Sequence, residues 1–126
     1  MHRPRIAVPR LNAALETARR TKVIQDIGYI AYEIDLYKQM YGVLPLDLPD
    51  KRLDPWGNPY QYLNFSTVKG KGQMRKNKFL VPINTDYDLY SMGPDGKSVA
   101  PLTAKASRDD IIRANDGQFF GPASEY

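Results

Sequence analysis

The chain has 126 residues, of which 42% are hydrophobic and 25% charged, and its formal net charge at pH 7 is +4. This length suits one domain with its own core and is too short for two independent domains. The lack of cysteine excludes disulfides and thiolate metal sites, and the printed sequence contains no apolar run of about 18 residues that could span a membrane.

The first third of the chain has the periodicity of an amphipathic α-helix. Six apolar or aromatic residues recur at spacings of 4, 3, 4, 3 and 4, and we expect them on one face of the helix: Val23, Ile27, Ile30, Ile34, Tyr37 and Tyr41. Leu11, Leu15 and Ala18 are expected to extend this stripe toward the N-terminus.

The ends of this helix are marked by Pro9 and by Gly42, so we expect it to cover residues 7–41. At a rise of 1.5 Å per residue it is roughly 50 Å long, more than a domain of this size can cover. We therefore expect the rest of the chain to pack on its C-terminal half. The half around Leu11 to Arg20 should project.

Short runs rich in aromatic and β-branched residues follow the helix. They predict strands at Tyr60 to Phe65, Phe79 to Ile83 and Tyr87 to Met92, joined by loops that favour antiparallel pairing. A long helix packed on a small antiparallel sheet gives an α+β fold in a single domain.

The remaining segments are expected to be irregular. Residues 42–59 form a connection that includes the turn "LDPWGNPYQY", which should press Trp56 against the helix. The sheet is expected within 60–92, and 93–126 is expected to be a C-terminal loop region. Within that region "DDIIRA" predicts a helical turn and "GQFF" a short strand.

Four segments in this order resemble the soluble part of a type II secretion major pseudopilin, a member of the type IV pilin superfamily. They are the helix from "AVPRLNAALETARRTKVIQDIGYI" to "YGVLP", then "LDPWGNPYQY", "DLYSMGPDGKS" and "DDI". The resemblance covers nearly the whole chain. In that family a prepilin peptidase removes a leader, and an apolar helix precedes the step seen here at Val8 and Pro9. We therefore expect this sequence to lack an N-terminal transmembrane segment.

The resemblance implies a pilin-like fold and a structural subunit, with no enzymatic activity. Its expected partners are copies of itself and minor pseudopilins in a filament, together with an inner-membrane assembly platform. The full-length protein is expected in the bacterial inner membrane with a periplasmic head, and its mature N-terminus is expected to be methylated.

The resemblance also suggests contacts between subunits. Asp35 matches a helix acid that pairs with a basic residue of a neighbouring subunit, and Lys51 and Arg52 are candidates for the partner. Leu11 and Leu15 on the projecting half are expected at the interface. The alternative for Asp35 is a solvated residue near Lys38, since exposed ion pairs contribute only about 0 to 1 kcal/mol.

A calcium site is implied by the resemblance, and the oxygen ligands that calcium prefers are present in the sequence. The ligands would be the carboxylates of Asp95, Asp109 and Asp110, with the carbonyl of Met92. Thirteen residues separate Asp95 from Asp109, which is more than is usual in the family, and they include cations. The alternative is an ordinary turn at Asp95, followed by a helix whose capping box begins at Ser107.

A basic loop supports a rival function. Between Ser66 and Pro82 the chain has five basic residues and no acidic one: Lys69, Lys71, Arg75, Lys76 and Lys78. Such a loop could bind nucleic acid phosphates or an acidic partner, although a solvated loop is the commoner outcome. The alternatives to a secretion pseudopilin are therefore a subunit of another type IV pilus or DNA-uptake machine, and a basic nucleic-acid-binding module.

Overall fold

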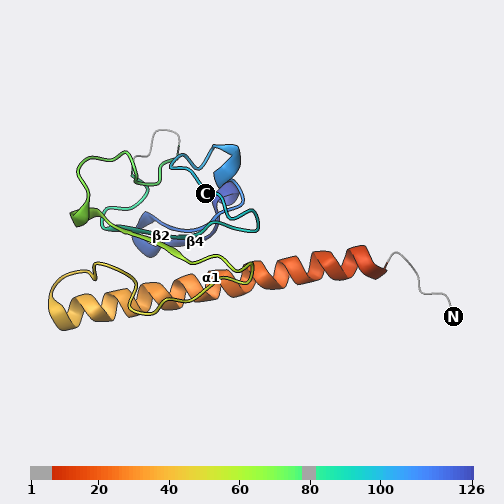
Figure 1. Cartoon of the computed structure of the whole chain (residues 1–126), viewed down its shortest axis with the longest axis horizontal. Coiled ribbons are helices and arrows are strands. Elements are labelled where there is room, and N and C mark those ends of the chain that lie inside the picture. Colours follow the sequence, from red (N-terminus) through yellow and green to blue (C-terminus); the bar gives the residue numbers. More distant parts are fainter. Residues whose placement is uncertain (1–6, 78–81) are drawn as a thin grey trace.

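A computed structural model describes residues 7–77 and 82–126. One long helix lies across one face of a small antiparallel sheet, which confirms the α+β class (Figure 1). The elements are the helix α1 (Ala7–Tyr41) and the strands β1 (Gln61–Asn64), β2 (Tyr87–Ser91), β3 (Ile111–Ala114) and β4 (Phe119–Pro122).

The strands of the sheet are ordered β1-β2-β3-β4, and each pairs antiparallel with its neighbour. The strands predicted around Tyr62 and Leu89 are confirmed, and these two residues are partners in the register of β1 and β2. Of the strand predicted at 79–83, the first three residues lie outside the described part of the chain. The last two, Pro82 and Ile83, lie in a bend.

The C-terminal region contributes two strands to the sheet, which corrects the expectation of a loop region. The prediction of a helical turn in "DDIIRA" is wrong, because Ile111 and Ile112 are both about 1% exposed and lie on opposite faces of β3. Ile111 packs in the core beneath α1, and Ile112 packs in a second cluster on the other face. The prediction of a short strand at "GQFF" is confirmed by β4.

The main core lies between α1 and the sheet. The helix contributes Val23, Ile27, Ile30, Ala31 and Ile34, and the sheet contributes Tyr87, Leu89 and Ile111. The second cluster, on the face away from α1, joins Tyr90 and Ile112 to Ile83, Leu102, Ala114 and Ala123. The loops therefore bury the outer face of this small sheet as well.

The predicted end of α1 and the predicted role of Trp56 are both confirmed. Gly42 has φ +75°, a conformation that favours glycine, and its N–H donates to the Lys38 carbonyl at 2.7 Å. The Asp54 carboxylate accepts hydrogen bonds from the backbone N–H groups of Trp56 and Asn58, at 3.0 and 2.9 Å. This turn packs Trp56 against the core, where its Nε1 donates to Glu16 of α1 at 3.5 Å.

The N-terminal part of α1 extends beyond the sheet, as predicted (red in Figure 1). Leu11 is 59% exposed and Leu15 42%. The expectation that Leu11, Leu15 and Ala18 lie on the same face of α1 as Val23 is wrong. The five residues from Ala18 to Val23 turn a 3.6-residue helix by about 140°, which moves the earlier residues to another face.

Candidate functional site

The candidate assembly surface is an apolar stripe on the face of α1 that points away from the sheet. We define the outer stripe as Leu11, Leu15, Ala18, Tyr29, Tyr32, Leu36 and Met40, all of which are exposed. Lys22 and Gln25 occupy the two positions in its middle, so consecutive positions from 11 to 36 are three or four residues apart. The outer stripe therefore runs along the projecting half and continues along the half that carries the head.

Of the charged residues predicted at a subunit interface, Asp35 precedes Leu36 of the outer stripe and Arg52 contacts Tyr29 of that stripe. Asp35 is exposed and forms no ion pair with another described residue, Lys38 included. Lys51 pairs with Asp47 of its own chain at 3.3 Å. The two predicted basic partners therefore do not contact Asp35 within one chain.

Arg52 is held within its own chain by several contacts. Its Nη2 pairs with Glu33 Oε1 at 3.2 Å and with Asp50 Oδ2 at 2.7 Å, and its guanidinium lies 5.1 Å from the centroid of the Tyr29 ring. The nearby carboxylates, Asp50 first, raise the pKa of Arg52. Arg52 thus fixes the 42–59 connection against α1, and Tyr29 remains 54% exposed.

The three predicted calcium ligands lie close enough to influence each other. Asp110 is fully buried, and its Oδ2 accepts a hydrogen bond from the Ser98 hydroxyl at 2.5 Å. Burial raises the pKa of Asp110 to about 7, the charges of Asp109 and Asp95 add to the rise, and the Ser98 hydrogen bond and the Arg75 charge oppose it. Burial also raises the pKa of Asp109, with a further contribution from the Asp95 charge.

Two carboxylate oxygens at this position are orphaned. Asp109 Oδ1 and Asp110 Oδ1 are buried and have no hydrogen-bond partner among the described residues. Asp95 is exposed, and its carboxylate accepts from the Lys97 N–H at 2.9 Å. Across residues 7–77 and 82–126, no group of three or more His, Cys, Asp or Glu side chains is arranged to hold a metal ion. Backbone carbonyls would have to complete any cation site.

The loop that contains Met92 lies directly on Asp109. Gly93 has φ +73°, and a Cβ atom placed there would be 2.4 Å from the Asp109 carbonyl oxygen. The Gly93 carbonyl accepts from Asn58 Nδ2 at 3.4 Å, which ties this loop to the Trp56 turn. Met92 is half-buried against the second cluster.

The alternative of a helix after Ser107 is wrong. Strand β3 begins at Ile111, and the Ser107 hydroxyl forms hydrogen bonds with the backbone of Val99.

The predicted basic loop does not present all its cations to solvent. Arg75 is half-buried, its guanidinium lies 4.2 Å from the centroid of the Tyr90 ring, and its Nη2 donates to the Tyr90 hydroxyl. Burial lowers the pKa of Arg75. Lys69 and Lys71 are exposed, Lys76 is half-buried, and Lys78 lies outside the described residues.

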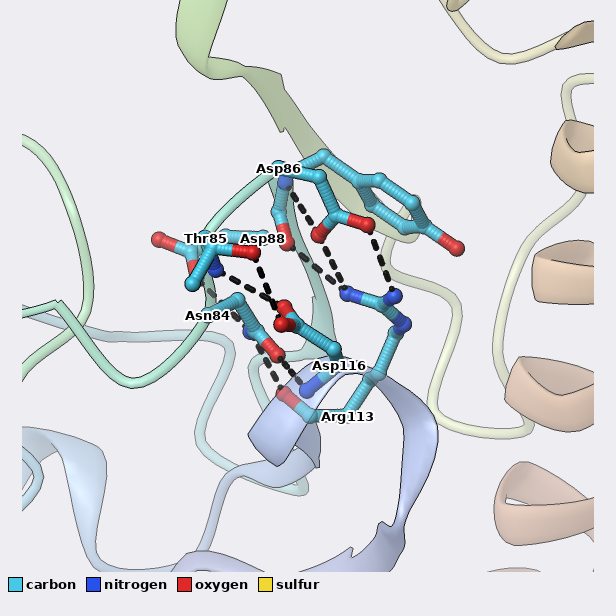
Figure 2. A network of polar contacts seen from close by, with 7 residues as sticks. Asn84, Thr85, Asp86, Asp88, Arg113 and Asp116 are labelled. Atoms are coloured by element: carbon cyan, nitrogen blue, oxygen red, sulfur yellow. Dashed lines mark hydrogen bonds and ion pairs between the residues drawn. The ribbon is translucent and has the colours of Figure 1, made fainter.

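Sequence reasoning missed a network of polar residues centred on Arg113 (Figure 2). Arg113 is 4% exposed, and its Nη1 donates to Asp86 at 3.0 Å and to the Tyr87 carbonyl at 3.1 Å. Asn84 donates to Asp88 at 3.1 Å and to the Arg113 carbonyl at 3.0 Å. The only hint in the sequence is "NTD", read as a simple connection, because nothing local pairs it with an arginine 27 residues later.

No protein-family model, curated protein sequence or solved structure matches this chain. Within the described residues, no helix is both long enough and apolar enough to cross a bilayer. The outer stripe and the acidic residues near Gly93 are therefore the features from which a function can be inferred.

Proposed function

We propose that this protein is a structural subunit of a filament, of the kind found in type II secretion pseudopili, and that it supports protein export without catalysing a reaction. One observation carries the proposal: the N-terminal part of α1 extends beyond the head and exposes Leu11 and Leu15. An exposed apolar stripe of this kind marks an interaction site. A contact between two different surfaces of identical subunits, repeated without closing, produces an open filament.

The resemblance of the sequence to type II secretion pseudopilins supports the other parts of this proposal. The partners are further copies of the chain, minor pseudopilins and an inner-membrane assembly platform, and the full-length precursor is processed by a prepilin peptidase. The full-length protein would place its head in the periplasm. Asp35, exposed and unpaired within the described chain, remains a candidate for a contact with a neighbouring subunit.

We also propose a calcium ion at Asp95, Asp109 and Asp110. The support is the pair of orphaned oxygens, Asp109 Oδ1 and Asp110 Oδ1, because a buried carboxylate oxygen without a partner is costly unless a cation or water satisfies it. Calcium accepts carboxylate, carbonyl and water oxygens in flexible geometry, so the Met92 carbonyl could complete the ligand set. The ion would neutralise the carboxylates and join the Gly93 loop to the start of β3.

The rival functions are DNA uptake and nucleic acid binding by a separate module. Lys69 and Lys71 are exposed and could contact phosphates. Arg75 is less suited to this role, because it is half-buried against Tyr90. The described part of the loop therefore offers fewer free cations than its sequence suggests, and nucleic acid binding is the weaker proposal.

Deletion of the gene in its natural host tests the proposed function. We expect proteins normally found in the medium to accumulate inside the cells, and export to return when the gene is supplied on a plasmid. The matched variant replaces Leu15 with Glu and should not restore export. Unchanged export together with a loss of DNA uptake would favour the rival function and contradict ours.

A further inference from the structure

We infer that the outer stripe of α1 packs in parallel against α1 of a second copy, displaced along the axis by 21 residues. This inference rests on the proposed function and specifies the register of its central contact. It would make the projecting half of one copy the partner of the head-bearing half of another.

The spacing of the outer stripe is that of a two-helix seam. From residue 11 to residue 32 its positions are separated alternately by four and three residues, an average of 3.5. Positions that repeat in this way stay in contact when two helices wind around each other. The buried residues Ile27 and Ile34 lie on the opposite side of α1, so the sheet does not obstruct the seam.

The polar centre of the outer stripe disfavours an undisplaced pair. In a parallel pair without displacement, Lys22 would face Lys22 and Gln25 would face Gln25 in the middle of the seam. Like charges at this distance repel, and polar residues at such positions lower stability while fixing the register. A displacement by a whole number of heptads keeps the spacing and moves these residues apart.

A displacement of three heptads gives the best apolar match. The residue difference 36 − 15 is 21, so Leu15 of one copy lies beside Leu36 of the other, and Leu11 lies beside Tyr32. All four side chains are exposed in the single chain. At 1.5 Å per residue the displacement is about 31 Å.

The charges beside the seam select the same register. Leu36 follows the previous seam residue, Tyr32, by four positions. In a parallel pair of helices, the residue just before such a seam position faces the partner residue that is aligned five positions further on. For Asp35 that aligned position is 40, so the facing residue of the partner is number 40 minus the displacement. Displacements of 7 and 14 put Glu33 and Asp26 there, and both repel Asp35. A displacement of 21 puts Arg19 there.

Arg19 is available for this contact. Its side chain is 41% exposed, and its Nη1 pairs with Glu16 of its own chain at 2.6 Å. Each copy would present its N-terminal half to one neighbour and its C-terminal half to another, so the contact does not close and the assembly stays open.

Disulfide crosslinking tests the register directly, because the chain has no cysteine of its own. Under mild oxidation at rising concentration, the Leu15→Cys/Leu36→Cys variant should form a ladder of covalent oligomers. The control is Thr17→Cys/Lys38→Cys, since both residues are exposed and also 21 positions apart but lie off the outer stripe. Equal ladders from these two variants would overturn the inference. So would a single Leu15→Cys variant that forms as much disulfide-linked dimer as the Leu15→Cys/Leu36→Cys variant forms crosslinked product.

Charge reversal gives an independent readout. In the Leu15→Cys/Leu36→Cys background, Asp35→Arg and Arg19→Asp should each reduce the ladder several-fold, and the two together should restore it. If the double reversal gives no more product than either single reversal, the register is wrong. Loss of export on gene deletion without any ladder would overturn only the register, whereas a ladder with unchanged export would overturn only the secretion function.

Discussion

Arg113 and Asp86 form a two-point ion pair that joins β3 to the residue before β2. Nη1 and Nη2 of Arg113 donate to the two Asp86 carboxylate oxygens at 3.0 and 3.2 Å, and the guanidinium lies 3.8 Å from the centroid of the Tyr87 ring (Figure 2). The arginine is 4% exposed, and the side chain of Asp86 is 32% exposed. The pair therefore connects the C-terminal strands to the rest of the sheet.

Replacing Arg113 with Met should lower the free energy of unfolding by about 1 to 3 kcal/mol, because it removes hydrogen bonds of a buried guanidinium to Asp86 and to the Tyr87 carbonyl. Urea denaturation followed by circular dichroism measures this change. Arg108→Met is the control, because Arg108 is exposed and should tolerate the change. Equal stability of the two variants would show that the Arg113 network contributes little.

Replacing Gly93 with Ala should destabilise the head by at least about 2 kcal/mol. The added Cβ atom would be 2.4 Å from the Asp109 carbonyl oxygen, and φ at this position is +73°. Gly72→Ala is the matched control, because nothing lies within 4 Å of a Cβ atom there. Thermal melts of both variants measure the difference, and a Gly93→Ala variant as stable as the control would contradict the close approach of the loop.

Replacing Asp110 with Asn tests the proposed calcium ion. In chelator, the variant should be the more stable protein by about 1 kcal/mol, or roughly 4 °C in melting temperature, since it removes a buried carboxylate with an orphaned oxygen.

Calcium should then raise the melting temperature of the parent chain and have no such effect on Asp110→Asn. Magnesium serves as the control ion, because it requires a more regular octahedral geometry. A parent chain whose melting temperature is the same in calcium and in chelator would rule out the site.

Replacing Leu15 with Glu should leave the melting temperature of the head within about 2 °C of the parent value, since exposed substitutions usually change stability by less than about 0.5 kcal/mol. The same replacement at Val23, which is fully buried, should unfold the head. Sedimentation of the Leu15→Glu chain should show weaker self-association than the parent. Equal self-association of the Leu15→Glu chain and the parent chain would show that the outer stripe does not mediate contacts between copies.

The sequence predicted the long helix well because its period is sustained over many turns. The prediction is wrong in placing Leu11 and Leu15 on the same face of the helix as Val23 and Ile27. Spacing within each half is regular, but the step from Ala18 to Val23 is five residues, and this moves the pattern from the outer face to the inner one. The helix therefore carries two apolar stripes on opposite faces, where the spacing alone predicts one.

The sheet and the acidic site were harder to predict because they depend on distant contacts. The pair Asp109 and Asp110 suggested the first turn of a helix, but Ile111 and Ile112 are buried on opposite faces of β3, and their burial determines the strand. Arg75 lies in a run of lysines and glycines that predicted a solvated loop. Only the fold shows that Tyr90 provides an aromatic ring for it.

Paramagnetic relaxation between mixed chains tests the central claim most directly. A Leu15→Cys chain without ¹⁵N carries a spin label on its cysteine and is mixed with the ¹⁵N-labelled parent chain. The control is a Thr17→Cys chain that carries the same spin label. We expect the label at position 15 to broaden the amide signals around Leu36 of the ¹⁵N chain more strongly than the label at position 17 does. Equal broadening by both labels, or broadening confined to the head strands, would contradict the claim that copies meet along α1.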